Sequence, residues 1–168
     1  AGQVCDGLHV HPFHTVEYLD EVVLPNVARG AAERDRPASA VTVAAPVLVA
    51  TGSTEEEIDA NRRVVARQIA FYASTPAYKR VLDLHGWGVG PELTRLSVRG
   101  EWDAMADVIP DEMIDTIAVS GPVASSAPQI RRRYGDRLGR VSLYSLDTPL
   151  PIDAAEWPNV IESLRDHS

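Results

Sequence analysis

The stretch of residues 41–50, VTVAAPVLVA, constrains the fold more than any other part of the chain. It is almost continuously apolar, and such a strand is buried on both faces, as in parallel sheets that helices cover on each side. Pro46 interrupts the run and has no backbone N–H. The strand must therefore hold Pro46 where that N–H is not needed, or bend there.

Helical patterns alternate with strand-like ones along the chain. Thr54 and Glu57 have capping-box spacing and predict a helix that ends near Ala73. Thr15 is placed to cap an earlier helix, which Pro25 should kink. Strands are predicted at residues 8–11, 41–50 and 140–146, with a brief strand-like piece at 117–119, and a last helix should begin at Asp153. This order is typical of βαβ units and a parallel sheet, and three strands do not close a barrel.

Residues 74–117 break the alternation. They contain short helical patterns separated by glycine and proline, too long for a simple connection and too helical for disorder. We interpret them as a helical insertion after the second strand, within a single domain of residues 1–168.

Charge and composition exclude several partner classes. The chain has 16 basic and 24 acidic residues, a net charge of -8, and we expect no nucleic-acid partner. The longest apolar run is too short to span a bilayer and no leader-like segment precedes it, so no membrane association is expected. The single cysteine, Cys5, rules out an internal disulfide and agrees with a cytoplasmic location.

The first predicted strand ends in a histidine cluster, GLHVHPFHT at residues 7–15. His9 and His11 alternate along the strand and share a face, and Pro12 ends the ladder. Polar residues at the carboxyl ends of parallel strands build the sites of barrel enzymes. We therefore predict that His11 lies in such a site, with His9, His14 and Phe13 beside it; the alternatives are an interior His9, a loop or capping His14 and a core Phe13.

A His-x-His pair on a strand also opens the metal site of some barrel hydrolases. Such a site needs further ligands from later strands. The residues on offer are Thr51, Ser120, Asp147 and His85, with no third strand-end histidine, and we expect no metal site.

Several segments together resemble the luciferase-like monooxygenase superfamily, and in particular its members that use the deazaflavin coenzyme F-420. They are AGQVCDGLHVHPFHT (1–15), VVLPNVARGAAE, RQIAFYASTPAYKRVLDLHGWG (67–88), DEMIDTIAVSGP (111–122) and RRRYGDRLGRVSLY (131–144). The resemblance implies the carboxyl-terminal half of a (β/α)8 TIM barrel, with about three βα units. Pro128 departs from the family pattern, because it lies where the helix after Gly121 and Pro122 should already run, and we expect that helix to start late or to be kinked.

The same resemblance implies an oxidoreductase or monooxygenase. Hydride transfer or oxygen activation would occur on F-420, or on FMN as the alternative, with a small organic substrate. His11 would then be the catalytic residue, and His9, His14 and Phe13 would contact the cofactor. The segment at 71–79 resembles the one that folds over the pocket, which implies substrate contacts for Tyr72, Ser74 and Tyr78; sealing of the core is the alternative for these residues. A homo-oligomer is expected, because half a barrel leaves strand edges open. A metal-dependent hydrolase and a non-catalytic half-barrel remain the competing functions.

Overall fold

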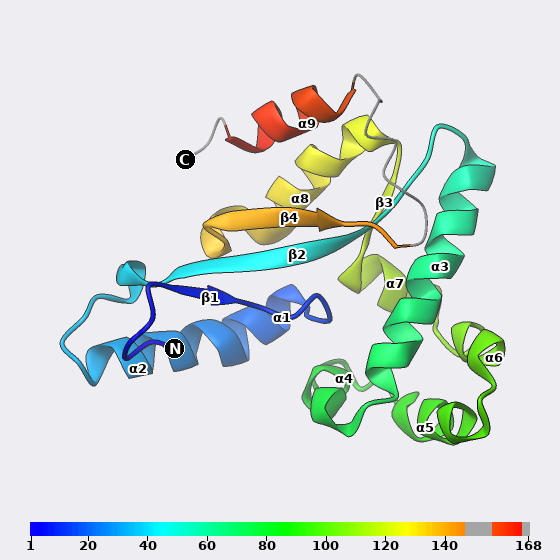
Figure 1. Cartoon of the computed structure of the whole chain (residues 1–168), viewed down its shortest axis with the longest axis horizontal. Helices are drawn as coiled ribbons and strands as arrows, with labels where there is room; N and C mark the ends of the chain where they lie inside the picture. The colour runs from blue at the N-terminus through cyan, green and yellow to red at the C-terminus, as the bar shows by residue number, and fades with distance from the viewer. Residues whose placement is uncertain (147–155, 166–168) are drawn as a thin grey trace.

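The computed structural model describes residues 1–146 and 156–165, in which four parallel strands form the sheet (Figure 1). They are β1 (Gly7–His9), β2 (Thr42–Thr51), β3 (Val119–Gly121) and β4 (Arg140–Tyr144). β2 is the central strand, since it pairs with β1 at its start, with β4 along its middle and with β3 at its end. The predicted parallel sheet is confirmed, and the strand-like piece predicted at 117–119 lies two residues later.

Pro46 sits in β2 without disturbing the pairing with β4. The Thr42 N–H donates to Asp6 and the Ala44 carbonyl accepts from Val10, so these two residues face β1, whereas the Val43 carbonyl accepts from Gly139 at the start of β4. Alternate residues of a strand face opposite edges. Pro46 therefore faces the β1 edge, beyond the last β1 pair at Ala44. Its missing N–H costs no hydrogen bond to β4.

The helices divide into those that follow strands and those of the insertion. The first group is α1 (Val16–Tyr18), a π-helical turn (Leu19–Val23), α2 (Leu24–Ala32), α3 (Glu55–Ala73), α8 (Ser126–Tyr134) and α9 (Glu156–Arg165). The second group is α4 (Lys79–His85), α5 (Gly90–Arg99), α6 (Trp102–Ala106) and α7 (Asp111–Ile117), which confirms the predicted helical insertion. No helix among the described residues is long and apolar enough to cross a membrane.

Local capping explains where the first long helices begin. The Thr54 hydroxyl accepts from the Glu57 N–H, the Glu57 carboxylate accepts from the Ser53 N–H, and α3 then runs to Ala73 as predicted. Thr15 caps α1 in the same way. The π-helical turn lies directly before Pro25: the Leu24 N–H bonds to the Leu19 carbonyl, five residues back. The distortion therefore lies where the proline was expected to disturb the helix.

The helix after β3 starts late, as expected. A 3-10 turn (Val123–Ser125) precedes α8, which places Pro128 in the first turn of the helix, where its missing N–H is tolerated. Serine is a common cap residue, but Ser126 lies inside this helix, and its hydroxyl is buried and has no partner among the described residues. The predicted start of the last helix at Asp153 falls outside the described residues.

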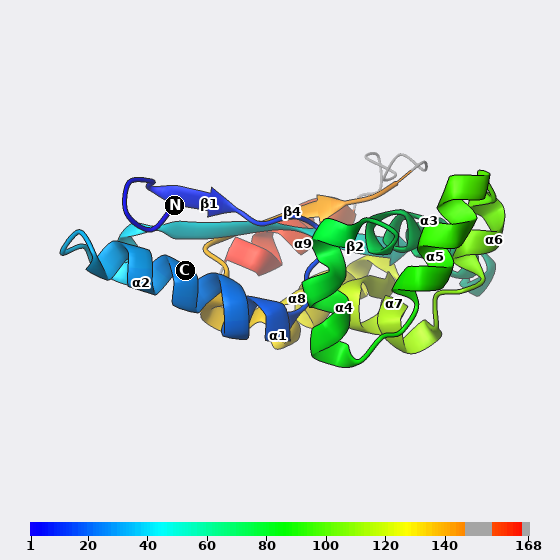
Figure 2. The ribbon, with the colours of Figure 1, turned by 90° about the horizontal axis from the view of Figure 1, so that it is seen from below.

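Two apolar clusters hold the sheet. Leu48 and Ala50 of β2 pack against α3 and the insertion helices, while Val43, Ala45, Val47 and Val49 pack against the π-helical turn and α8. The insertion and α3 thus lie against one face of the sheet at its carboxyl end, and α1, α2 and α8 lie against the opposite face (Figure 2).

Candidate functional site

A cavity of about 220 Å³ lies beside the carboxyl end of β1, between α1 and the start of α4. His9, His11, Tyr18, Tyr78 and Arg80 provide its polar lining, and the rest is apolar, including Phe13 and Val81. Of the predicted site residues, His9, His11, Phe13 and Tyr78 line this cavity, whereas His14, Tyr72 and Ser74 do not. His11 and Tyr78 are 67 positions apart in the sequence, and the fold brings them together at the end of β1.

The loop after β1 explains the position of His11. The last ladder bond runs from the Val10 N–H to the Ala44 carbonyl, and Pro12 then turns the chain away from the sheet. The Phe13 N–H donates to His11 Nδ1 at 3.2 Å, and the His14 ring bonds through Nδ1 to the His11 carbonyl at 2.8 Å. The loop is thus fixed on both sides of the His11 ring.

Two tyrosines hold the His11 ring. Tyr72 belongs to α3, and Tyr78 lies in the turn that follows α3. Tyr78 stacks on it with ring centroids 4.6 Å apart, and its hydroxyl lies 3.0 Å from His11 Nε2. Tyr72 meets the ring edge-on, also at 4.6 Å. Burial lowers the pKa of His11 below its ordinary value, so the ring is neutral at pH 7.

Tyr72 forms the wall behind this cluster rather than the lining of the cavity. Burial, followed by a hydrogen bond with Tyr144, raises the pKa of Tyr72 to about 12. Tyr144 lies near the end of β4, and sequence reasoning missed its role. Its place near the carboxyl end of a predicted strand was the signal available, but its partner lies far away in the sequence.

His14 and Ser74 lie away from the cavity. His14 is 1% exposed, packs near Tyr134, and has no partner for Nε2 among the described residues. Its pKa is lowered, chiefly by burial. The Ser74 hydroxyl donates to the Phe71 carbonyl at the end of α3. In this arrangement neither side chain reaches a ligand in the cavity.

A polar contact ties the insertion to the first helix. His85 Nε2 lies 2.9 Å from the hydroxyl of fully buried Thr15 and 3.5 Å from a Glu17 carboxylate oxygen, and its ring stacks on Trp87. The turn at residues 85–87 is therefore anchored at His85. This contact fixes α4, which carries Arg80 and Val81 into the cavity wall.

The donor set does not suit a metal ion. Both ring nitrogens of His11 are engaged, one by the Phe13 N–H and one by Tyr78. Within residues 1–146 and 156–165, no three His, Cys, Asp or Glu side chains are grouped closely enough to hold a metal.

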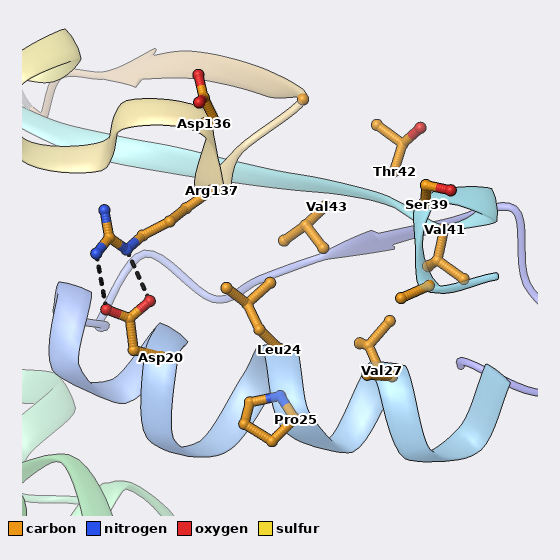
Figure 3. A pocket seen from close by; sticks show the side chains of 13 residues that line it. Asp20, Leu24, Pro25, Val27, Ser39, Val41, Thr42, Val43, Asp136 and Arg137 are labelled. Carbon is orange, nitrogen blue, oxygen red and sulfur yellow. Dashed lines mark hydrogen bonds and ion pairs between the residues drawn. The ribbon is translucent and has the colours of Figure 1, made fainter. Parts of the chain in front are cut away.

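A larger groove of about 510 Å³ lies at the opposite, amino end of β2 (Figure 3). Leu24 and Val27 of α2 point toward the sheet there, and Arg137 donates to both carboxylate oxygens of Asp20, at 2.7 and 2.8 Å. These hydrogen bonds lower the pKa of Asp20. The charge of Arg137 is thus already neutralised, and barrel sites form at carboxyl strand ends. We assign this groove to packing between α2 and the sheet.

The sequence matches known proteins over most of its length. The family model of luciferase-like monooxygenases matches residues 1–139. Uncharacterized proteins of Mycobacterium tuberculosis (Rv1360) and Mycobacterium bovis (Mb1395) are each 47% identical over 141 residues, which is 83% of this chain and 42% of theirs. The chain therefore spans about two fifths of the length of these curated relatives.

Solved structures share the fold at lower identity. A coenzyme F-420-dependent tetrahydromethanopterin reductase from Methanopyrus kandleri matches 85% of this chain and 40% of its own, with a TM-score of 0.67 and 20% identity. An F-420-dependent secondary alcohol dehydrogenase, solved with an F-420–acetone adduct, matches 99% of this chain and 45% of its own, with a TM-score of 0.67 and 14% identity. The predicted α/β fold, part of a luciferase-like TIM barrel, is confirmed.

Proposed function

Because the chain belongs to the luciferase-like monooxygenase family, we propose that it is part of an oxidoreductase that uses the deazaflavin coenzyme F-420 and acts on a small organic substrate. FMN is the alternative coenzyme. The observation that carries the proposal is the aromatic cavity at the carboxyl end of β1, where His11 and Tyr78 are stacked and hydrogen-bonded. The two similar F-420-dependent structures favour the deazaflavin over FMN.

The lining of the cavity fits one end of a planar ring. Its walls are largely aromatic or aliphatic, and a few polar side chains, among them Tyr78 and Arg80, offer hydrogen bonds. At about 220 Å³ the cavity is smaller than the roughly 300–1,000 Å³ of complete ligand pockets. This chain would therefore supply part of the site, in agreement with the share of its relatives that it spans.

The residues would divide the work as follows. The bound coenzyme would supply hydride transfer, and this chain would bind the coenzyme, orient its ring and keep water away from it. Tyr78 and His11 would position the ring edge, Phe13 and Val81 would exclude water, and Tyr72 would support the His11 ring from behind. His9 would contact the ligand from the strand itself.

The test is a titration of this chain with oxidised F-420 and, separately, with FMN, followed by coenzyme fluorescence. Saturable binding that His11→Ala weakens supports the proposal. His11→Phe is the matched variant, because it keeps a ring in the stack but removes both nitrogens. Circular dichroism of each variant controls for folding.

Metal content is measured on the same samples. Stoichiometric zinc without ring binding would overturn the proposal in favour of a hydrolase. If the chain binds neither a coenzyme ring nor zinc, the remaining interpretation is a non-catalytic half-barrel.

A further inference from the structure

The two hydrogen bonds of His11 determine which of its ring nitrogens carries the proton. The Phe13 backbone N–H can only donate, so His11 Nδ1, 3.2 Å away, must accept and has no hydrogen. A neutral imidazole carries one hydrogen, which must then lie on Nε2. Burial of the ring favours this neutral form.

This protonation state sets the direction of the contact with Tyr78. Nε2–H donates to the Tyr78 hydroxyl oxygen, 3.0 Å away. The oxygen is thereby used as an acceptor, and the hydroxyl's own hydrogen points elsewhere. Among the described residues the Tyr78 hydroxyl has no second partner. Donation from an imidazole also makes the phenol a stronger donor, because linked hydrogen bonds polarise one another.

The stack restricts where that hydrogen can go. Tyr78 lies nearly parallel to the His11 ring, at an interplanar angle of 27°, and Tyr72 closes the edge of the same ring. Tyr78 lines the cavity, and so does His11, whose Nε2 lies 3.0 Å from the Tyr78 hydroxyl. His9, Tyr18 and Arg80 are the other titratable or charged groups in the lining.

We propose that Tyr78 donates a hydrogen bond to a carbonyl oxygen of whatever occupies this cavity, and that His11 is a positioning residue that orients the Tyr78 hydroxyl. This inference rests on the proposed function for the identity of the occupant, whose carbonyl can belong to the coenzyme ring or to a ketone substrate. It changes the role predicted for His11, since the neutral His11 ring uses both nitrogens within the protein.

The first test needs no ligand. Nitrogen-15 NMR of the labelled chain at pH 7 reports which ring nitrogen of His11 is protonated. We expect the Nε2-protonated neutral ring, in wild type and in Tyr78→Phe, because the Phe13 N–H remains in both. A hydrogen on Nδ1, or a charged ring, would overturn the inference.

The second test separates the two sources of the carbonyl. Affinity for oxidised F-420 is measured by fluorescence, and affinity for cyclohexanone by the shift of the aromatic ring signals of residue 78, whether tyrosine or phenylalanine. Tyr78→Phe should weaken one of the two affinities about tenfold, the loss of one net hydrogen bond. The matched control is Tyr134→Phe, which removes a buried tyrosine hydroxyl at the end of α8, outside the cavity lining, and should leave both affinities nearly unchanged.

The role of His11 is tested by rescue. His11→Gln can still offer an amide N–H to Tyr78 and should retain most of the affinity, whereas His11→Leu should lose as much as Tyr78→Phe. The double variant with Tyr78→Phe should lose no more. If wild type binds F-420 but Tyr78→Phe binds both probes normally, the donor role is refuted and the proposed function stands. If wild type binds no ring, the proposed function fails, and the NMR and cyclohexanone results still decide the role of Tyr78.

Discussion

Replacing Thr15 by valine should destabilise the fold and loosen the cavity wall at the same time. The Thr15 hydroxyl accepts from the Tyr18 N–H at the start of α1 and also bonds to His85 Nε2 at the end of α4. Valine keeps the shape of threonine but leaves both partners unsatisfied. Loss of the helix cap costs about 1 kcal/mol. Loss of the second hydrogen bond costs about as much again.

The expected decrease in the free energy of unfolding is therefore about 2 kcal/mol, measured by urea denaturation followed by circular dichroism. Thr15→Ser is the matched control, because it keeps the hydroxyl and loses only a methyl group, at about 0.8 kcal/mol. The contact with His85 is isolated by a double-mutant cycle with His85→Ala, in which the stacking on Trp87 cancels.

The cycle should give a coupling of about 1 kcal/mol between Thr15 and His85. Thr15→Val should also weaken ring binding, since α4 carries Arg80 and Val81 into the cavity wall. Equal stability of the valine and serine variants, or a coupling near zero, would refute the reasoning, because the hydroxyl would then contribute nothing to either contact.

Three further predictions test the packing and the assembly. Burial lowers the pKa of His14 below 6.5, so the unfolded chain takes up the proton first. The free energy of unfolding should fall as the pH drops below that value, and His14→Gln should reduce the slope in urea titrations; an unchanged slope would contradict it. Gly2→Ala should cost about 1–3 kcal/mol, because its Cβ would lie 2.2 Å from the Val27 carbonyl oxygen, while Gly88→Ala, in open space, should cost little; equal melting temperatures would count against this. Light scattering at micromolar concentration should find a homo-oligomer, and a monodisperse monomer would exclude it.

Local patterns were enough to predict most of the elements. The apolar run of β2 and the Thr54–Glu57 cap of α3 depend on residues close together in the sequence, and both predictions hold. The brief β3 strand was placed two residues early, because a strand of three residues carries almost no periodic signal. Ser126 has a residue type that suits a cap, but it lies within α8 and its hydroxyl is buried without a partner among the described residues.

The site was harder to predict, because its contacts join distant segments. His11 and Tyr78 are 67 residues apart, yet both were singled out, one from its place at a strand end and the other from the family resemblance. His14 lies in the same loop as His11, but its ring turns toward Tyr134, far along the chain. Nothing near His14 in the sequence distinguishes a ring that enters the core from one that faces a cavity.

The sheet itself indicates where a partner would bind. Side chains of paired residues on adjacent parallel strands share a face, so the registers place one set of residues together. Over the amino half of β2 this set is Gly7, His9, Thr42, Ala44, Pro46, Arg140 and Ser142. All of them except the half-buried Ala44 and the buried Pro46 are exposed, and no described helix lies over β1 and the amino half of β2 on that side (Figure 2).

That open face differs from the rest of the sheet in its composition. It carries His9 and Arg140 on either side of the small Ala44, instead of the branched apolar side chains that fill the interior of most barrels. A polar face of this kind is stable in water, so the isolated chain does not depend on covering it. Association is favoured instead by the outer edges of β1 and β4, where backbone N–H and C=O groups have no neighbouring strand in the part of the chain that the structure describes. An oligomer that forms should therefore be sensitive to a proline placed in β4 at Val141, whose N–H faces the open edge in this register, and insensitive to Arg140→Gln on the open face.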